Sequence, residues 1–123
     1  MLYKIDQPIY PINIYIHIGT DINGTLNQFI DADTNLIIND SWDNCYGKVY
    51  RNLLKDNKYA LLLAFEDIPK NGFISHELIH VVNRLYEHIG QTHFGDENNA
   101  YLTEFLFNEV ETAITKYKEL NKE

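Results

Sequence analysis

Two histidines and one glutamate stand at a spacing that metal chemistry uses. His76, Glu77 and His80 form the pattern His-Glu-x-x-His. On a helix the two imidazoles would lie about one turn apart, so both could bind one tetrahedral zinc ion. Glu77 would then be placed to act as general base on a water molecule at the metal. The pattern predicts one Zn²⁺ bound by His76 and His80, with Glu77 as the catalytic group.

The residues around this motif indicate the helix that the motif requires. Between residues 73 and 89, apolar side chains recur at steps of three, four and seven, and Gly90 is a plausible stop. At about 100° per residue, the two histidines lie almost opposite the centre of this apolar stripe. We expect them to face a cleft against a sheet. The alternative is a chance pattern on a solvated helix face.

A third zinc ligand has to come from another part of the chain. One turn beyond His80 stands Arg84, which offers no lone pair to a metal. A second helix is predicted from Asp96 or Glu97 to about Tyr117, and an extended link of about 20 Å after Gly90 would let Glu97 return to the metal. The alternative is that Asp96 and Glu97 only cap and charge the helix N-terminus.

The stretch after the motif resembles the ExxA element of gluzincins. In that element a helical Glu that follows HExxH is the third zinc ligand, and here Glu97-Asn98-Asn99-Ala100-Tyr101 has the same form. The resemblance implies that Glu97 is the ligand. The other candidates for this ligand are Asp96, His93 and Glu104.

Apolar patterns before the motif predict a small sheet. Residues 12–18 alternate as in a strand with one face on the core, and residues 59–65 are apolar on both faces. Residues 26–30 and 36–38 flank a turn-forming segment, so we expect a hairpin or bent strand. Val49, Tyr50, Leu53 and Leu54 fit a short helix face. The predicted class is α+β: a small mixed sheet followed by two packed helices in one zincin-like domain, residues 1–123, with a solvated tail at 118–123.

The amino-acid composition limits the kinds of partner that the chain is expected to bind. The chain has 123 residues, 45% of them hydrophobic, and a net charge of -8, which disfavours direct contact with nucleic acid. Cys45 is the single cysteine, so no internal disulfide is expected. The first residues lack the pattern of a signal peptide, and the apolar runs are too short to span a bilayer, so neither secretion nor a membrane partner is expected.

Other polar residues are weaker candidates for the site. Asn83 shares the histidine face and could support a ligand, Glu87 is expected to be solvated, and His17 and His88 are expected to be ordinary residues. A tyrosine hydroxyl could stabilise a tetrahedral oxyanion, but most tyrosines must pack in the core. The tyrosines considered for this role are Tyr46, Tyr50 and Tyr101.

The chain as a whole resembles small HExxH proteins encoded by tailed phages of gut bacteria, including crAss-like phages. The resemblance covers roughly residues 9–112 and rests on the 12–18 alternation after Ile9-Tyr10-Pro11, on Ala32-Asp33-Thr34, on residues 59–65, on the stretch 74–83 and on Glu97-Asn98-Asn99-Ala100-Tyr101-Leu102. Asn83 departs from it, since an acid is expected there. Loss of that acid would argue for weak zinc binding or none.

The resemblance implies two different functions. One is a zinc metallopeptidase that cuts a peptide or protein in the host cytoplasm during infection. The other is a virion component, such as a head-tail connector or neck ring subunit that contacts other phage structural proteins, with a structural or vestigial zinc site. A small toxin, or a protein that cleaves a repressor, is a third class.

Overall fold

A five-stranded sheet forms the centre of the computed structural model, with strand order β1-β2-β5-β4-β3. The structure describes residues 1–8, 10–90 and 96–122, and of residues 96–99 the backbone alone. The strands are β1 (Leu2–Lys4), β2 (Asn13–Ile18), β3 (Ile30–Asp31), β4 (Gly47–Lys55) and β5 (Lys58–Phe65), and the helices are α1 (Ile22–Leu26), α2 (Asn71–His88) and α3 (Asp96–Leu120). The predicted α+β class is confirmed.

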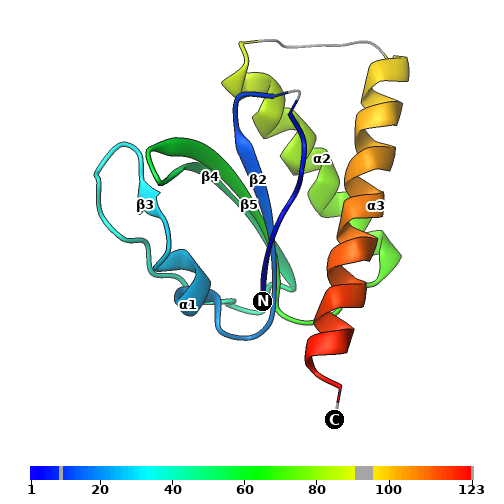
Figure 1. Cartoon of the computed structure of the whole chain (residues 1–123), viewed down its shortest axis with the longest axis horizontal. Coiled ribbons are helices and arrows are strands. Elements are labelled where there is room, and N and C mark those ends of the chain that lie inside the picture. The colour runs from blue at the N-terminus through cyan, green and yellow to red at the C-terminus, as the bar shows by residue number, and fades with distance from the viewer. Residues whose placement is uncertain (9, 91–95, 123) are drawn as a thin grey trace.

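The sheet is mixed, and its two central strands are covered on both faces. β2 runs parallel to β5, whereas β1 on β2, β4 on β5, and β3 on β4 are antiparallel. α2 and α3 cover one face and α1 lies on the other (Figure 1). The first face buries Ile14, Ile16, Ile18, Leu61, Leu63 and Phe65 under the helices, and the second buries Tyr15, Ala60, Leu62 and Ala64 with α1. Burial on both faces explains why residues 59–65 are apolar without alternation.

The two long helices agree with their predicted positions. The predicted helix 73–89 corresponds to α2, whose last residue is His88 and whose C-cap is Ile89. Gly90 follows with a positive φ of 76°. α3 begins at Asp96, as expected, and buries Leu102, Leu106, Val110 and Ala113. Both helices therefore use their apolar stripes to form one core with β2 and β5.

Residues 47–55 form a strand, so the predicted short helix was wrong. The ladder between β4 and β5 shifts register between Tyr50 and Leu53, and Asn52 has φ 58°. This β-bulge inserts one extra residue into β4, with three residue steps from Tyr50 to Leu53 opposite two on β5. Tyr50 and Leu53 therefore lie on one face of the sheet, while Val49 packs on the other. The resulting spacing of apolar residues imitates that of a helix.

The predicted hairpin at 26–38 was only partly right. Leu26 ends α1, whose N-cap Asp21 accepts a hydrogen bond from the Gly24 amide at 2.9 Å. The turn at 31–35 is present, since Asp31 Oδ1 accepts from the Asp33 amide at 2.7 Å and the Asp31 amide donates to the Leu36 carbonyl at 2.9 Å. The strand ladder of β3, however, is formed with β4. β1 and α1 were not predicted.

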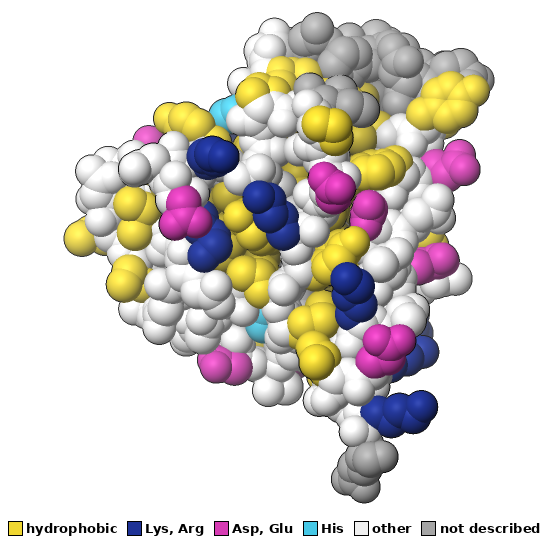
Figure 2. Space-filling model, in the orientation of Figure 1, with side chains coloured by type: hydrophobic (Ala, Val, Ile, Leu, Met, Phe, Trp, Pro, Cys, Tyr) yellow, Lys and Arg dark blue, Asp and Glu magenta, His cyan; other side chains and the backbone are white. Residues whose placement is uncertain are grey.

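Charged side chains of both signs are interspersed on the face of the molecule drawn in Figure 2. That face carries no broad basic area of the kind that a phosphate backbone would need. Within the described residues, no helix combines the length and apolar character needed to cross a membrane.

Candidate functional site

The motif histidines lie together on the solvent side of α2. His76 and His80 are both exposed, and the His76 side chain is 68% accessible. Their ring centroids are 5.1 Å apart and the rings are nearly perpendicular, with an interplanar angle of 76°. Two imidazoles on one tetrahedral zinc, each bonded at about 2.1 Å, would have centroids roughly 5 Å apart. The separation of the two rings is therefore the one that a shared zinc ion would require.

Glu77 differs from the histidines because it packs against the sheet. Its side chain is only 12% exposed, and Oε1 lies 3.9 Å from His76 Nε2. That separation leaves the carboxylate beside the two rings without a direct hydrogen bond to His76. Glu77 is thus held between α2 and the first residue of β4, beside His76.

Gly47 makes this placement of Glu77 possible. A Cβ atom built on Gly47 would lie 3.1 Å from Glu77 Cγ and 3.2 Å from two ring carbons of Phe65. Phe65 is fully buried and cannot move aside. The absence of a side chain at Gly47 therefore lets α2 approach β4 closely at the level of Glu77.

The third predicted ligand lies outside the described side chains. Glu97 is in the first turn of α3, and the structure describes its backbone alone; the same holds for Asp96, while His93 falls in the undescribed segment. Glu104 is described and exposed. Among described residues, no group of three or more His, Cys, Asp or Glu side chains is assembled for a metal. Glu97 as ligand stays a prediction.

The strand that faces Glu77 has an open edge. The Glu66 amide donates to the Tyr46 carbonyl at 3.2 Å, so Tyr46 and Glu66 are a hydrogen-bonded pair that continues the antiparallel ladder between β4 and β5. In such a ladder, every second residue of β4 bonds to β5, and the residues between them do not. The polar backbone groups of Gly47 and Val49 must then point away from β5. β3 covers the far end of β4 only, at Leu53 and Leu54. Within the described chain, no backbone hydrogen bond is made to the outer edge at residues 47–49.

A groove of about 400 Å³ lies between this edge and α2. Its lining combines the candidate general base, one motif histidine and both faces of the start of β4. The lining residues are Asp40, Gly47, Lys48, Val49, Tyr50, Glu77, His80 and Arg84. The sequence predicted that both histidines face a cleft against a sheet, but only His80 of the two lines this groove. The strand that forms its wall, β4, is the segment predicted to be helical.

An acidic side chain not predicted for the site organises the outer wall of this groove. Asp40 Oδ2 accepts from the Tyr50 hydroxyl at 2.7 Å and from Lys48 Nζ at 3.1 Å. Burial alone would raise the pKa of Asp40, but the hydrogen bonds from Tyr50, Ser41 and Lys48 outweigh it and hold that pKa below its usual value. Burial and the same bond to Asp40 raise the pKa of Tyr50. Since its hydroxyl is bound to Asp40, Tyr50 is not available as an oxyanion donor.

His17 is a buried structural residue. The alternation of residues 12–18 predicted a strand with only one face on the core, and this was wrong because α1 and its neighbours cover the other face of β2 as well. His17 is 2% exposed, with Nδ1 2.6 Å from Thr25 Oγ1 and Nε2 2.8 Å from the Gly19 carbonyl. Because a carbonyl can only accept, Nε2 carries the proton and Nδ1 accepts from Thr25. Burial lowers the pKa of His17. The ring ties the end of β2 to α1 and takes no part in the groove.

The remaining predicted residues lie on the outer surface. Asn83 is exposed on α2, and His88 packs its ring against Tyr59 with centroids 5.1 Å apart. Glu87 is 55% exposed, as expected, but it also binds Arg84 at 2.7 Å and Arg51 at 3.3 Å. Tyr101 is 67% exposed on α3, and Tyr46 packs on Phe73.

Comparison of the chain with protein-family models, with curated protein sequences and with solved structures gave no significant match. The site therefore has to be interpreted from its own geometry.

Proposed function

We propose that the chain is a zinc-dependent peptide hydrolase with Glu77 as its general base. The observation that carries the proposal is the arrangement of His76 and His80, whose rings are 5.1 Å apart, around the half-buried Glu77 at the open edge of β4. A solvated helix face would not need a glycine opposite its glutamate. An open strand edge is a surface on which an extended peptide can form main-chain hydrogen bonds.

The residues have separate tasks in this proposal. His76, His80 and Glu97 would hold the zinc, which when bound supplies a Lewis acid for the substrate carbonyl. Gly47 and Val49 would bind the peptide backbone. Glu77 removes a proton from water as the water oxygen bonds to the carbonyl carbon. It then delivers that proton to the amine nitrogen as the carbon–nitrogen bond breaks, so hydrolysis consumes one water and regenerates the carboxylate.

The first test is metal content, measured by mass spectrometry on the purified full chain. We expect one zinc per chain, and loss of that zinc in His76→Ala and Glu97→Gln. Lys118→Gln, which changes an exposed residue in the last turn of α3, is the control and should keep its zinc. A folded protein without zinc, or with zinc unaffected by His76→Ala, would contradict the metal site.

The second test is hydrolysis of a quenched fluorescent peptide library. Glu77→Gln should lower the rate by about 10²-fold or more, the typical share of a general base, while zinc content is unchanged. Circular dichroism would check that the variant is folded. Cleavage at the same rate by Glu77→Gln would show that another group, or a contaminant, does the chemistry.

Exposed apolar residues on the two long helices favour a second candidate function, a subunit of a phage ring assembly. Ile79 on α2 is 61% exposed, and Tyr101 and Phe105, one turn apart on α3, are 67% and 38% exposed. Such side chains are typical of surfaces that bury against a partner, here a second copy of this chain. The protein would then act in the head-tail region of the virion rather than in the host cytoplasm. Light scattering would separate the two functions, since a ring requires a multiple of the 14.4 kDa monomer that Tyr101→Ser and Phe105→Ser reduce to the monomer.

A further inference from the structure

Two further spaces lie along α2, one before and one after the groove beside Glu77, and the second of them shares Arg84 with that groove. One stripe of α2 contributes to all three spaces, at alternating steps of four and three residues: Phe73, Glu77, His80, Arg84 and Glu87. β4 runs in the same direction as α2, because its first residue, Gly47, meets Glu77 and its later residue Arg51 binds Glu87. The candidate general base thus lies between the two ends.

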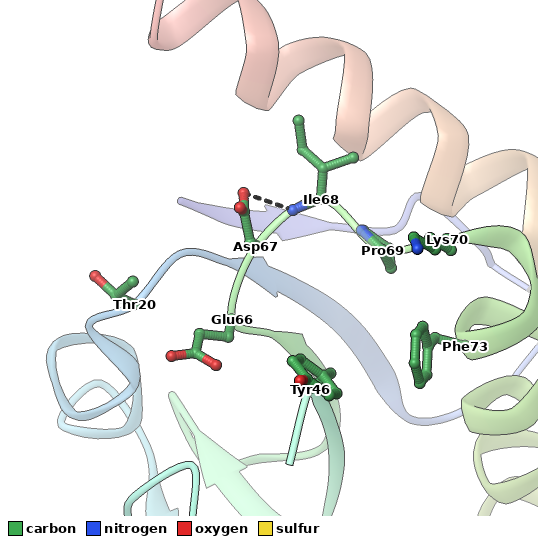
Figure 3. A pocket seen from close by; sticks show the side chains of 8 residues that line it. All are labelled: Thr20, Tyr46, Glu66, Asp67, Ile68, Pro69, Lys70 and Phe73. Atoms are coloured by element: carbon green, nitrogen blue, oxygen red, sulfur yellow. Dashed lines mark hydrogen bonds between the residues drawn. The ribbon is translucent and has the colours of Figure 1, made fainter. Parts of the chain in front are cut away.

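The first end combines an aromatic wall with a charged one. It is a pocket of about 540 Å³ where the Tyr46 and Phe73 rings pack with centroids 5.4 Å apart, and Glu66, Asp67 and Lys70 also line it. These rings are 65% and 44% exposed, and Ile68 is 40% exposed. In Figure 3 the two rings lie beside each other on one side of the pocket, and the Glu66 carboxylate points toward Thr20 on the other. A concave site with exposed large apolar side chains fits an apolar side chain of a ligand.

The second end carries two guanidiniums. Arg51 and Arg84 both bind the single carboxylate of Glu87, and Asp33, which is ion-paired to neither of them, also lines this end, so the formal charges of its lining cancel. Each guanidinium has five N–H donors, and Glu87 is bound through Nη1 of each. A space of about 320 Å³ adjoins the pair. Paired guanidiniums beside such a space suit a carboxylate.

We propose that the groove binds an extended peptide with an acidic side chain at the Arg51–Arg84 end and a large apolar side chain at the Tyr46–Phe73 end. This inference rests on the proposed function, because it takes the peptide bond between the two side chains to lie at Glu77. The inference adds a substrate class to the proposed function, a peptide segment that runs from an acidic to an apolar side chain. The His-Glu-x-x-His motif alone does not indicate such a class.

The spacing of the two ends sets the spacing in the peptide. From Phe73 to Arg84, α2 rises about 16 Å at 1.5 Å per residue. Four steps of an extended peptide cover about 13 Å and bring two side chains to the same face, and the long arginine side chains span the rest. Antiparallel pairing with β4 is the more stable arrangement, and it places the acidic residue first. The expected pattern is Glu-x-x-x-Phe.

Fluorescence anisotropy of labelled peptides, blocked at both ends, would test this with the full chain and with Glu77→Gln. We expect Glu-x-x-x-Phe to bind about tenfold more tightly than Lys-x-x-x-Phe, because the lysine peptide loses roughly one charge-assisted hydrogen bond. We expect a similar factor of about ten over Glu-x-x-x-Ser, because the serine peptide buries no large apolar side chain. Arg51→Gln and Arg84→Gln should each remove most of the preference for Glu over Lys, and Phe73→Ala the preference for Phe. Glu87→Gln should strengthen binding, because it removes the competing carboxylate. Lys118→Gln, with the same charge change far along α3, should alter neither preference.

Several results would overturn the inference. These are no binding by any of the peptides, unchanged preferences in the arginine variants, tighter binding of Phe-x-x-x-Glu, or tighter binding of a peptide whose only carboxylate is its C-terminus. Failure of the proposed function has a different signature, because selective binding without zinc or cleavage would refute the hydrolase and support the groove's selectivity. Cleavage that depends on Glu77 but ignores Arg51, Arg84 and Phe73 would support the hydrolase and refute the selectivity.

Discussion

Replacing Gly47 with alanine should destabilise the protein and displace Glu77. The new Cβ would lie 3.1 Å from Glu77 Cγ and 3.2 Å from the ring of Phe65, closer than apolar carbons normally pack. Overpacking of a fixed core costs about 1–3 kcal/mol, and the loss of glycine's freedom in the unfolded chain offsets about 0.4–1 kcal/mol of it. The free energy of unfolding should therefore fall by about 1–2 kcal/mol, or roughly 5 °C in melting temperature.

Urea denaturation followed by circular dichroism would measure this change, with Gly72→Ala as the control. Gly72 is also a glycine, in the first turn of α2, but a Cβ there would meet nothing within 4 Å. Alanine at Gly72 should thus raise stability by up to about 1 kcal/mol through helix propensity. Since Glu77 can swing away where Phe65 cannot, Gly47→Ala should also lower the proposed peptidase activity without changing the zinc content expected under that proposal. Equal or increased stability of Gly47→Ala would refute the close-packing argument.

Three further predictions concern groups with shifted pKa values. Burial lowers the pKa of His17, so the unfolded chain binds the proton more readily than the folded chain does. The free energy of unfolding should therefore fall as the pH drops below about 6.5. In His17→Gln, the midpoint of urea denaturation should lose this part of its pH dependence. The hydrogen bond to Glu109 and burial raise the pKa of Tyr3 to about 12, so in Glu109→Gln its ionisation, followed by ultraviolet absorbance, should move toward 10; an unchanged curve would contradict the 2.7 Å bond. Tyr50→Phe should lower the free energy of unfolding by about 1 kcal/mol, because Asp40 loses a charge-assisted bond yet stays partly solvated; no change in the urea midpoint would mean that water replaces the hydroxyl fully.

The elements that the sequence predicted correctly are those whose apolar pattern no local feature disturbs. The two long helices carry uninterrupted stripes, and residues 60–65 of β5 are all apolar because both faces of the strand are covered there. α1 was missed because it has five residues, depends on the Asp21 cap and contains Gly24, which has a low helix propensity. β1 is three residues long and is positioned by its pairing with β2, a contact distant in sequence. Periodicity cannot detect elements this short, because they contain fewer than two full periods of a buried face.

The sequence predicted which motif residues lie together and that a sheet faces them, but not which strand forms that wall. His76, Glu77 and His80 are adjacent in sequence, so helix geometry alone brings them together. The opposite wall depends on β4, whose irregular step at Asn52 gives its apolar residues a helical spacing. Without that strand, Phe73, Glu77 and Arg84 read as an ordinary solvated stripe, since periodicity separates the core face of a helix from the rest but does not distinguish open solvent from a groove. The informative residue was Gly47, because a glycine that begins a strand and has no turn to make indicates that another element comes close to its backbone.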